Sequence, residues 1–218
     1  MRCDKGYMCL YAVTDRAWIG EQTLYKQVEA ALKGGVTCVQ LREKDLDDAD
    51  FYAEALEISA LCKKYNVPFI INDNVDIAIK CKADGIHVGQ RDMQVSDVRK
   101  KVGNEMIIGV SAHSVEEAKE AVKNGADYLG VGAVFSTATK ADASVLPMDT
   151  LRDICQAVDV PVVAIGGISR RNIEKLSGSG VDGVALVSAI FAAEDIEAEC
   201  CLLRSLSEQM VKGEEKEV

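Results

Sequence analysis

Four charged residues follow an apolar run without a break in the segment CVQLREKD, which spans residues 38–45. Alternate side chains of an extended strand lie on the same side of it. One side of this strand therefore carries Gln40, Arg42 and Lys44, and the other carries Leu41 and Glu43. Two cations and an amide form an anion clamp, in which each charge-assisted hydrogen bond would contribute about 1.5–3 kcal/mol. Salt bridges within the charged run are the alternative, and we expect one for Glu43 beside the clamp.

Two carboxylates follow later strands of the chain. The segment FIIND ends in Asn72 and Asp73, and HVGQRD ends in Asp92. If the two strands are neighbours, both carboxylates meet at one edge, where they suit Mg²⁺ together with phosphate oxygens and water. The alternative makes Asp73 a helix N-cap and Asp92 an ordinary loop residue. The pair together favours the metal site.

Small residues end two segments near the C-terminus. AIGGI contains Gly166 and Gly167, and LVSAI contains Val187 and Ser188. Loops after the seventh and eighth strands of a (β/α)₈ barrel often bind phosphate through backbone N–H groups, which glycine lets the anion approach. Paired glycines that only make a tight turn are the alternative. We favour a phosphate site.

Two further polar segments are candidates for ligand contacts. The loop FSTATKADAS, residues 135–144, carries three hydroxyls and then Lys140, so it can close over a phosphorylated ligand; a plain surface loop is the alternative. In GVSAH, Ser111 can donate to an anion. We expect structural roles for His113 and His87, because neither has a Ser or Cys arranged beside it as a nucleophile.

The elements that must position these residues alternate regularly. Eight β-rich runs are separated by helical patterns with a repeat of about 25 residues, which predicts parallel βαβ units and a single (β/α)₈ TIM barrel of class α/β. An open doubly wound sheet is the main alternative, but the first strand ends in YAVTD and lacks the G-x-G-x-x-G fingerprint. We expect one domain over residues 1–218, with a charged tail, 212–218, that frays.

Composition narrows the class of protein. The net charge of −10 disfavours a nucleic-acid partner and leaves room for phosphorylated small molecules held by a few local cations. No apolar run approaches the roughly 20 residues that span a bilayer, and the N-terminus lacks a secretory signal, so we expect a cytoplasmic protein that binds no membrane. The eight cysteines contain no C-x-x-C pair, which favours small apolar fillers over a metal site.

Two anion sites and a divalent metal indicate a diphosphate on one substrate and a phosphate on another. Mg²⁺ with Arg and Lys would stabilise a departing diphosphate. The residues thus indicate either a transferase with pyrophosphate as leaving group or a phosphosugar enzyme.

In order along about residues 8–191, eight segments resemble the thiamine-phosphate synthase family: YAVTD, VQLREKD, INDNVDIA, ADGIHVGQRD, GVSAHS, GADYLGVGAVFSTATK, VAIGGI and GVALVSAI. The resemblance implies a barrel enzyme that joins two thiamine precursors. Hydroxymethylpyrimidine diphosphate would lose pyrophosphate, and the nitrogen of hydroxyethylthiazole phosphate would attack the resulting pyrimidine carbocation. Such chemistry needs leaving-group stabilisation and positioning more than a strong base.

The resemblance also implies three sets of site residues. The pyrimidine diphosphate would be bound by Gln40, Leu41, Arg42, Glu43, Lys44, Asn72, Ser111 and Lys140. Mg²⁺ would be bound by Asp73 and Asp92. The thiazole phosphate would be bound by Thr137, Ala138, Thr139, Gly167, Val187 and Ser188. The catalytic part would fall to Arg42, Lys44, Ser111 and Lys140.

The departures from the family pattern are mild and remove no charged group that the mechanism needs: Arg91, Ala138 and the segment GISRRN. Two alternatives to a synthase remain open. One is the related thiazole tautomerase branch, which carries a histidine where this chain has Ala133. The other is a non-catalytic sensor of a phosphorylated ligand.

Overall fold

The structure, a computed structural model, describes residues 3–90, 92–137 and 145–213. Eight parallel strands close into a barrel in sequence order, each paired with its neighbours in the chain and the last with the first. They are β1 (Leu10–Val13), β2 (Cys38–Leu41), β3 (Phe69–Asn72), β4 (Gly85–Val88), β5 (Ile107–Ala112), β6 (Tyr128–Gly132), β7 (Val162–Ile165) and β8 (Gly183–Leu186). The predicted (β/α)₈ barrel is confirmed, and the open doubly wound sheet is wrong.

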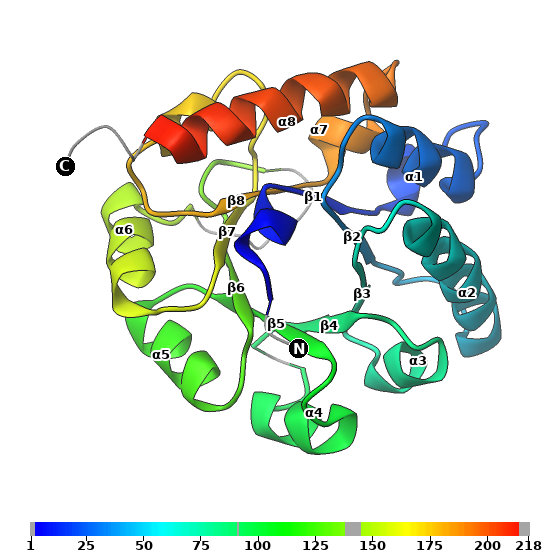
Figure 1. Cartoon of the computed structure of the whole chain (residues 1–218), viewed down its shortest axis with the longest axis horizontal. Helices are drawn as coiled ribbons and strands as arrows, with labels where there is room; N and C mark the ends of the chain where they lie inside the picture. Colours follow the sequence, from blue (N-terminus) through cyan, green and yellow to red (C-terminus); the bar gives the residue numbers. More distant parts are fainter. Residues whose placement is uncertain (1–2, 91, 138–144, 214–218) are drawn as a thin grey trace.

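Helices form a ring around the barrel (Figure 1). They are α1 (Leu24–Lys33), α2 (Asp48–Lys64), α3 (Val75–Lys80), α4 (Val95–Val102), α5 (Val115–Lys123), α6 (Met148–Ala157), α7 (Ser188–Phe191) and α8 (Ile196–Lys212). Three short 3₁₀ segments complete the described elements: η1 (Lys5–Met8), η2 (Arg16–Trp18) and η3 (Ile173–Leu176). The connection from β7 to β8 is irregular, because its helical part is only the 3₁₀ turn η3.

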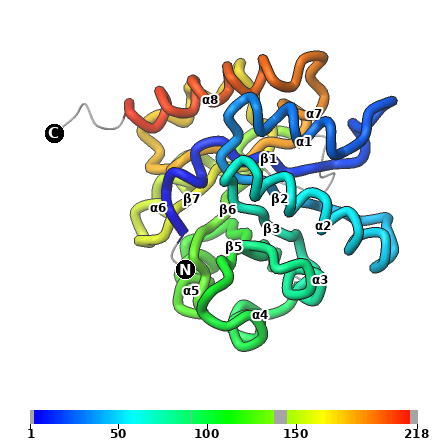
Figure 2. The backbone as a smooth tube through the Cα atoms, turned by 45° about the vertical axis from the view of Figure 1, so that its right-hand side comes forward, coloured from blue at the N-terminus to red at the C-terminus, as the bar shows by residue number. Residues whose placement is uncertain are grey.

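The last helix closes the ring against the first. Figure 2 shows α8 running beside α1, and the two helices pack against each other. The first residue of the expected tail, Lys212, is the last residue of α8. Residues 214–218 of the expected tail lie outside the described part of the chain. No described helix combines the length and apolarity needed to cross a bilayer.

The strands have two buried faces, which explains why they are almost continuously apolar. The outer face packs against the helices in one large core that includes Val39 and Leu41 of β2. The inner face forms a smaller core inside the barrel, which includes Cys38 of β2 together with Tyr11 and Tyr128. The side chains of β2 therefore alternate as the sequence predicts, and this alternation directs its polar end toward the barrel mouth.

Candidate active site

A cavity of about 500 Å³ opens at the carboxyl ends of the strands, a size typical of small-molecule sites. We call it the barrel cavity. Most of the predicted site residues line it: Gln40, Arg42, Lys44, Asn72, Asp73, Asp92, Ser111, Thr137, Gly167, Val187 and Ser188. The chain folds so that residues from six strand ends and the sixth loop meet in one space.

Five predicted residues stand apart from this set. Leu41 is fully buried in the helix-facing core, and Glu43 is also directed away, so neither side chain lines the barrel cavity. A contact of either residue with a substrate would have to come from its backbone. Ala138, Thr139 and Lys140 lie outside the described residues, and their roles stay predictions.

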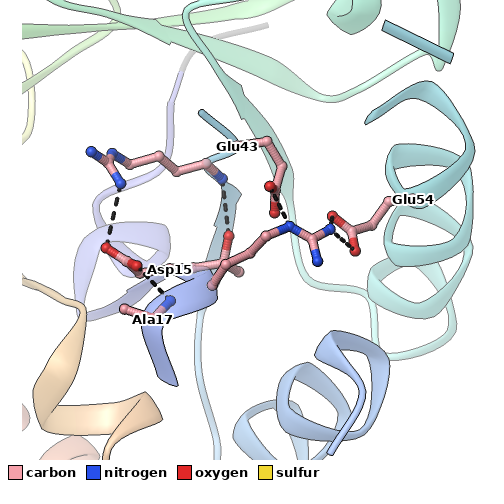
Figure 3. Close-up of polar contacts among 7 residues, drawn as sticks. Asp15, Ala17, Glu43 and Glu54 are labelled. Atoms are coloured by element: carbon pink, nitrogen blue, oxygen red, sulfur yellow. Dashed lines mark hydrogen bonds and ion pairs between the residues drawn. The ribbon is translucent and has the colours of Figure 1, made fainter. Parts of the chain in front are cut away.

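The end of β1 holds the anion clamp in place. The Arg42 N–H donates to Thr14 Oγ1 at 2.9 Å, and Arg42 Nη1 donates to Asp15 Oδ2 at 3.4 Å. Asp15 also caps η2 by accepting from the N–H of Ala17 at 2.9 Å (Figure 3). The first strand end thereby fixes both the backbone and the guanidinium of Arg42.

Behind the clamp, Arg16 links the second strand end to helix α2. Its Nε lies 2.6 Å from Glu43 Oε2, and its Nη2 lies 2.7 Å from Glu54 Oε1. Glu43 and Glu54 lie together on the side of this network opposite to Asp15 (Figure 3). The salt bridge expected for Glu43 thus exists, but its partner is Arg16 and not a residue of the charged run. Asp15 and Arg16 are not among the residues predicted from the sequence, although a charged pair directly after the first strand was a usable signal.

The Glu43 carboxyl is buried, and its hydrogen bonding is incomplete. Its side chain is only 1% exposed, and among the described residues its Oε1 has no hydrogen-bond partner. Burial raises the pKa of Glu43 to about 7, and the neighbouring Glu54 carboxylate adds to this, against the opposing effect of Arg16. One guanidinium is therefore shared between two carboxylates.

The two predicted metal ligands lie close enough to perturb each other. Burial opposes the ionisation of Asp73, but hydrogen bonding to Lys44 and to Asp92 outweighs it and lowers the pKa of Asp73. Burial raises the pKa of Asp92, to which the Asp73 carboxylate contributes, although Asp92 Oδ2 accepts from the N–H of Gly89 at 2.7 Å. One carboxylate keeps its charge at the expense of the other.

Asp73 does not cap a helix, so that alternative is wrong. Asn74 is the N-cap of α3, and its side chain accepts from the N–H of Ile77 at 3.0 Å. Asp73 instead adopts a left-handed backbone conformation with φ of 61°, which is unusual for a residue with a side chain. Its carboxylate accepts from Lys44 Nζ at 2.6 Å in the barrel cavity.

The donor set suits Mg²⁺. Mg²⁺ binds through one or two carboxylates and completes its shell with water and substrate phosphate. Asp73 and Asp92 supply two carboxylates in one wall of the barrel cavity. Among the described residues, no group of three or more His, Cys, Asp or Glu side chains offers a cage made of protein alone.

Ser111 and its neighbours line the part of the cavity at the end of β5, the strand next to β4. His87 Nε2 lies 3.0 Å from Ser111 Oγ, and Gln90 Nε2 donates to the Ser111 carbonyl oxygen at 2.6 Å. His113 is exposed, and its N–H donates to Glu117 Oε2 at 2.7 Å, at the start of α5. His113 thus has a structural contact, as expected. The expectation that neither histidine has a serine beside it is wrong for His87, whose Nε2 meets Ser111.

The glycine pair after β7 brings backbone to the cavity wall. Gly166 and Gly167 have φ of 97° and 66°. A Cβ on Gly167 would lie 2.4 Å from the carbonyl oxygen of Ser136, so only glycine lets this turn pack against the sixth loop. Asn172 Nδ2 donates to the Gly167 carbonyl oxygen at 2.9 Å and holds the turn.

Comparisons with known proteins show the family to which the chain belongs. The model of the family described as thiamine monophosphate synthase matches residues 10–190. Thiamine-phosphate synthase of Clostridium acetobutylicum is 50% identical over 188 residues, covering 86% of this chain and 89% of the relative. The corresponding protein of Clostridium beijerinckii is 52% identical over 187 residues, covering 86% and 90%.

A solved structure gives the same result. Thiamine phosphate pyrophosphorylase from Pyrococcus furiosus superposes with a TM-score of 0.88 at 38% identity, over 95% of this chain and 98% of that one. The match covers nearly the whole of both chains. The chain belongs to the thiamine monophosphate synthase family and is an enzyme of the transferase class.

Proposed function

We propose that the protein is a Mg²⁺-dependent thiamine-phosphate synthase. It joins hydroxymethylpyrimidine diphosphate to hydroxyethylthiazole phosphate and releases pyrophosphate. The observation that carries this proposal is the meeting of Arg42 and Lys44 with Asp73 and Asp92 in one cavity, opposite small residues that admit a second phosphate. Cations beside two carboxylates suit a diphosphate that arrives with a divalent metal.

The reaction needs little proton transfer. The pyrimidine C–O bond breaks heterolytically and leaves a carbocation, with both electrons on the departing pyrophosphate. The thiazole nitrogen then donates its lone pair to the methylene carbon and becomes positively charged. Since that nitrogen carries no proton, no base has to remove one. Catalysis therefore depends on stabilising negative charge on the leaving group and on alignment.

The residues of the chain divide this work by position. Arg42, Lys44 and Ser111 donate to the diphosphate, and Lys140 is assigned the same role from the family pattern. Gln40 and Asn72 orient the pyrimidine. Mg²⁺ held by Asp73 and Asp92 would neutralise charge on the diphosphate when it is bound.

The thiazole phosphate is assigned to the other wall of the cavity. Thr137, Gly167, Val187 and Ser188 line it, with Ala138 and Thr139 added from the family pattern. Backbone N–H groups and hydroxyls bind a monophosphate without a full cation, which keeps the stronger positive charge for the diphosphate. The two substrates would thus be sorted by charge.

The tautomerase alternative has less support. The position that carries histidine in that branch is Ala133, which lines the barrel cavity and offers no titratable group. The cations and carboxylates of the diphosphate site are present in the sequence. The proposal also states that all substrates are small molecules and that the protein is cytoplasmic. The location is in keeping with eight cysteines that serve as small apolar fillers, since disulfides are rare in the cytoplasm.

The proposal is tested by incubating the pure protein with both precursors and Mg²⁺. Thiamine phosphate and pyrophosphate should form in equal amounts, and a chelator should stop the reaction. Absence of both products with Mg²⁺ present would refute the synthase. Conversion of a thiazole carboxylate tautomer without the pyrimidine would support the tautomerase, and tight binding without any conversion would support the sensor.

A further inference from the structure

A chain of hydrogen bonds crosses the interior of the barrel between two cavity residues, Gln40 and Ser111, and Tyr11 and His87 within it also line the barrel cavity. Gln40 Nε2 donates to the Tyr11 hydroxyl at 2.8 Å, and the Tyr11 and Tyr128 hydroxyls lie 2.7 Å apart. Tyr128 is 2.9 Å from His87 Nδ1, and His87 Nε2 is 3.0 Å from Ser111 Oγ. We call these five residues the core hydrogen-bond chain. They come from β1, β2, β4, β5 and β6.

The two tyrosines of the core hydrogen-bond chain lie in an apolar core, which ordinarily excludes polar groups. Tyr11 and Tyr128 are 1% and 0% exposed and belong to the core inside the barrel. Their rings meet edge to face with centroids 5.9 Å apart. A buried hydroxyl without a partner is costly, and here each hydroxyl has two partners. The arrangement is therefore complete from end to end.

Two glycines leave the space that the side chains of the core hydrogen-bond chain occupy. In the barrel ladder Gly109 of β5 pairs with His87 on one side and with Tyr128 on the other. A Cβ on Gly109 would lie 2.0 Å from Tyr128 Cζ, and one on Gly130 would lie 3.1 Å from His87 Cε1. Because β5 has no side chain at this rung, Tyr128 reaches His87 across it. Glycine weakens a strand interior, so a packing reason of this kind is expected for it.

The direction of the hydrogen bonds follows from one end. Since Gln40 Nε2 is a donor, Tyr11 accepts from it and donates its own proton to Tyr128. Tyr128 then donates to His87 Nδ1. A neutral imidazole that accepts at Nδ1 carries its proton on Nε2 and donates it to Ser111 Oγ. The Ser111 proton is left to donate into the barrel cavity.

The opposite direction would suit the ligand badly. If every bond were reversed, Ser111 would give its proton to His87 and present only lone pairs to the cavity. A diphosphate needs donors, so its binding favours the direction in which Ser111 donates. Burial also raises the pKa of Tyr11 and of Tyr128 well above the ordinary value, so both hydroxyls keep the protons that they donate.

We propose that Tyr11, Tyr128 and His87 are positioning residues that hold the Ser111 hydroxyl as a hydrogen-bond donor directed at the departing diphosphate. The proposal rests on the proposed function for the identity of the ligand. The tautomer of His87 that it requires is a property of the protein alone.

The first test uses the intact protein without substrate. Full-length protein labelled with ¹⁵N-histidine contains two imidazoles, and His87→Gln removes one of them, which assigns the spectrum. At pH 8.5, above the ordinary histidine pKa of about 6.5, His87 should carry its proton on Nε2 with Nδ1 unprotonated. A proton on Nδ1 instead, or a mixture of both tautomers, would overturn the proposal whether or not the protein is a synthase.

The second test uses a double-mutant cycle of Tyr128→Phe with Ser111→Ala. Tyr128→Phe keeps the ring and removes one hydroxyl. We expect kcat to fall about tenfold, because this is the effect of losing about one hydrogen bond to the transition state. The KM for thiazole phosphate should not change. In the Ser111→Ala background the same substitution should have no further effect on kcat, because Tyr128 acts through Ser111. Additive losses would mean that Tyr128 has only a packing role and would overturn the proposal.

Matched variants distinguish loss of the core hydrogen-bond chain from a general loss of folding or stability. Tyr52→Phe on α2 removes the same atom from a tyrosine outside the chain and should leave kcat unchanged. If Tyr128→Phe does not fold, His87→Gln and His87→Leu replace it. Glutamine keeps an N–H donor near Ser111 and should retain most of the activity, whereas leucine should lose at least tenfold. Equal activity of these two variants would overturn the proposal. A correct His87 tautomer in a protein without synthase activity would refute the proposed function and leave the core hydrogen-bond chain intact.

Discussion

Lys44 Nζ lies 2.6 Å from Asp73 Oδ2, so a cation of the anion clamp and a carboxylate of the predicted metal site hold each other directly. The two groups come from the ends of adjacent strands, β2 and β3. Their contact places the metal carboxylate within reach of the same diphosphate that the clamp would bind. Metal and clamp should therefore act on one ligand, and changes in either should be felt in the other.

Asp73→Asn should weaken Mg²⁺-dependent turnover. The amide keeps the size of the side chain but removes its charge, so the Mg²⁺ concentration for half-maximal turnover should rise about tenfold or more, a loss that even changes outside a ligand shell can cause. Turnover measured across a Mg²⁺ titration is the readout. Asp76→Asn, on the exposed face of α3, is the matched control and should behave like the unaltered protein. Unchanged turnover of Asp73→Asn at limiting Mg²⁺ would remove Asp73 from the metal site.

Arg16→Gln should impair the pyrimidine diphosphate selectively. Arg16 does not line the barrel cavity, but it holds Glu43 between the two cations of the clamp. We expect KM for the pyrimidine diphosphate to rise about tenfold, equivalent to roughly 1.4 kcal/mol, with no change in KM for thiazole phosphate. Initial rates at varied concentrations of each substrate provide the measurement.

The control for that prediction is Arg152→Gln, which removes an arginine from an exposed ion pair with Asp149 on α6. Exposed pairs contribute little, so its kinetics should not change. If Arg16→Gln raised KM for both substrates equally, Arg16 would stabilise the barrel mouth in general and not the clamp.

Stability should depend on pH through Glu43. The folded protein holds the pKa of Glu43 at about 7, above the ordinary value of 4.5, because of burial. The stabilising contribution of this group is complete below pH 4.5 and is lost as the pH rises through 7, since over this range the unfolded state releases the proton that the folded state still holds. The difference in unfolding free energy between Glu43→Gln and the unaltered protein should therefore shift in favour of the variant when the pH is raised from 5.5 to 8. Urea unfolding at both values checks this, and a constant difference would contradict it.

Gly109→Ala should destabilise the barrel strongly. The added methyl would overlap the ring of Tyr128, which is fully buried. Overpacking of this kind costs about 1–3 kcal/mol, and here the displaced ring also breaks its hydrogen bonds. Thermal unfolding is the measurement. Gly213→Ala at the end of α8 is the control, because a Cβ there would have 3.8 Å to its nearest neighbour. An equal melting temperature for the two variants would show that the barrel interior can adapt.

Local patterns along the chain were enough for the fold class and for part of the site. Alternation along β2 separates Gln40, Arg42 and Lys44 from Leu41 and Glu43, because successive side chains of a strand must point to opposite faces. The repeat of strand and helix leads to a closed barrel, which places the ends of all strands at one mouth. The alternation and the strand–helix repeat depend only on residues close together in the sequence. The binding and catalytic roles of the lining residues stay predictions.

Some local choices were nevertheless ambiguous in the sequence. Asp73 and Asn74 are both good N-caps, and nothing in the neighbouring residues decides between them. Asn74 caps α3 in the folded chain, while Asp73 takes a left-handed conformation beside Lys44. The deciding contact comes from a residue 29 positions away.

By itself, the sequence determined the order of strands and helices, the direction of alternate side chains and the list of polar residues at the strand ends. Tertiary structure alone decided which of these residues have partners. Arg16 meets Glu43 across 27 residues, and Tyr11 meets Tyr128 across 117. The physical reason is barrel closure, which brings distant strands together around one axis and makes buried polar groups find partners wherever the closed barrel provides them.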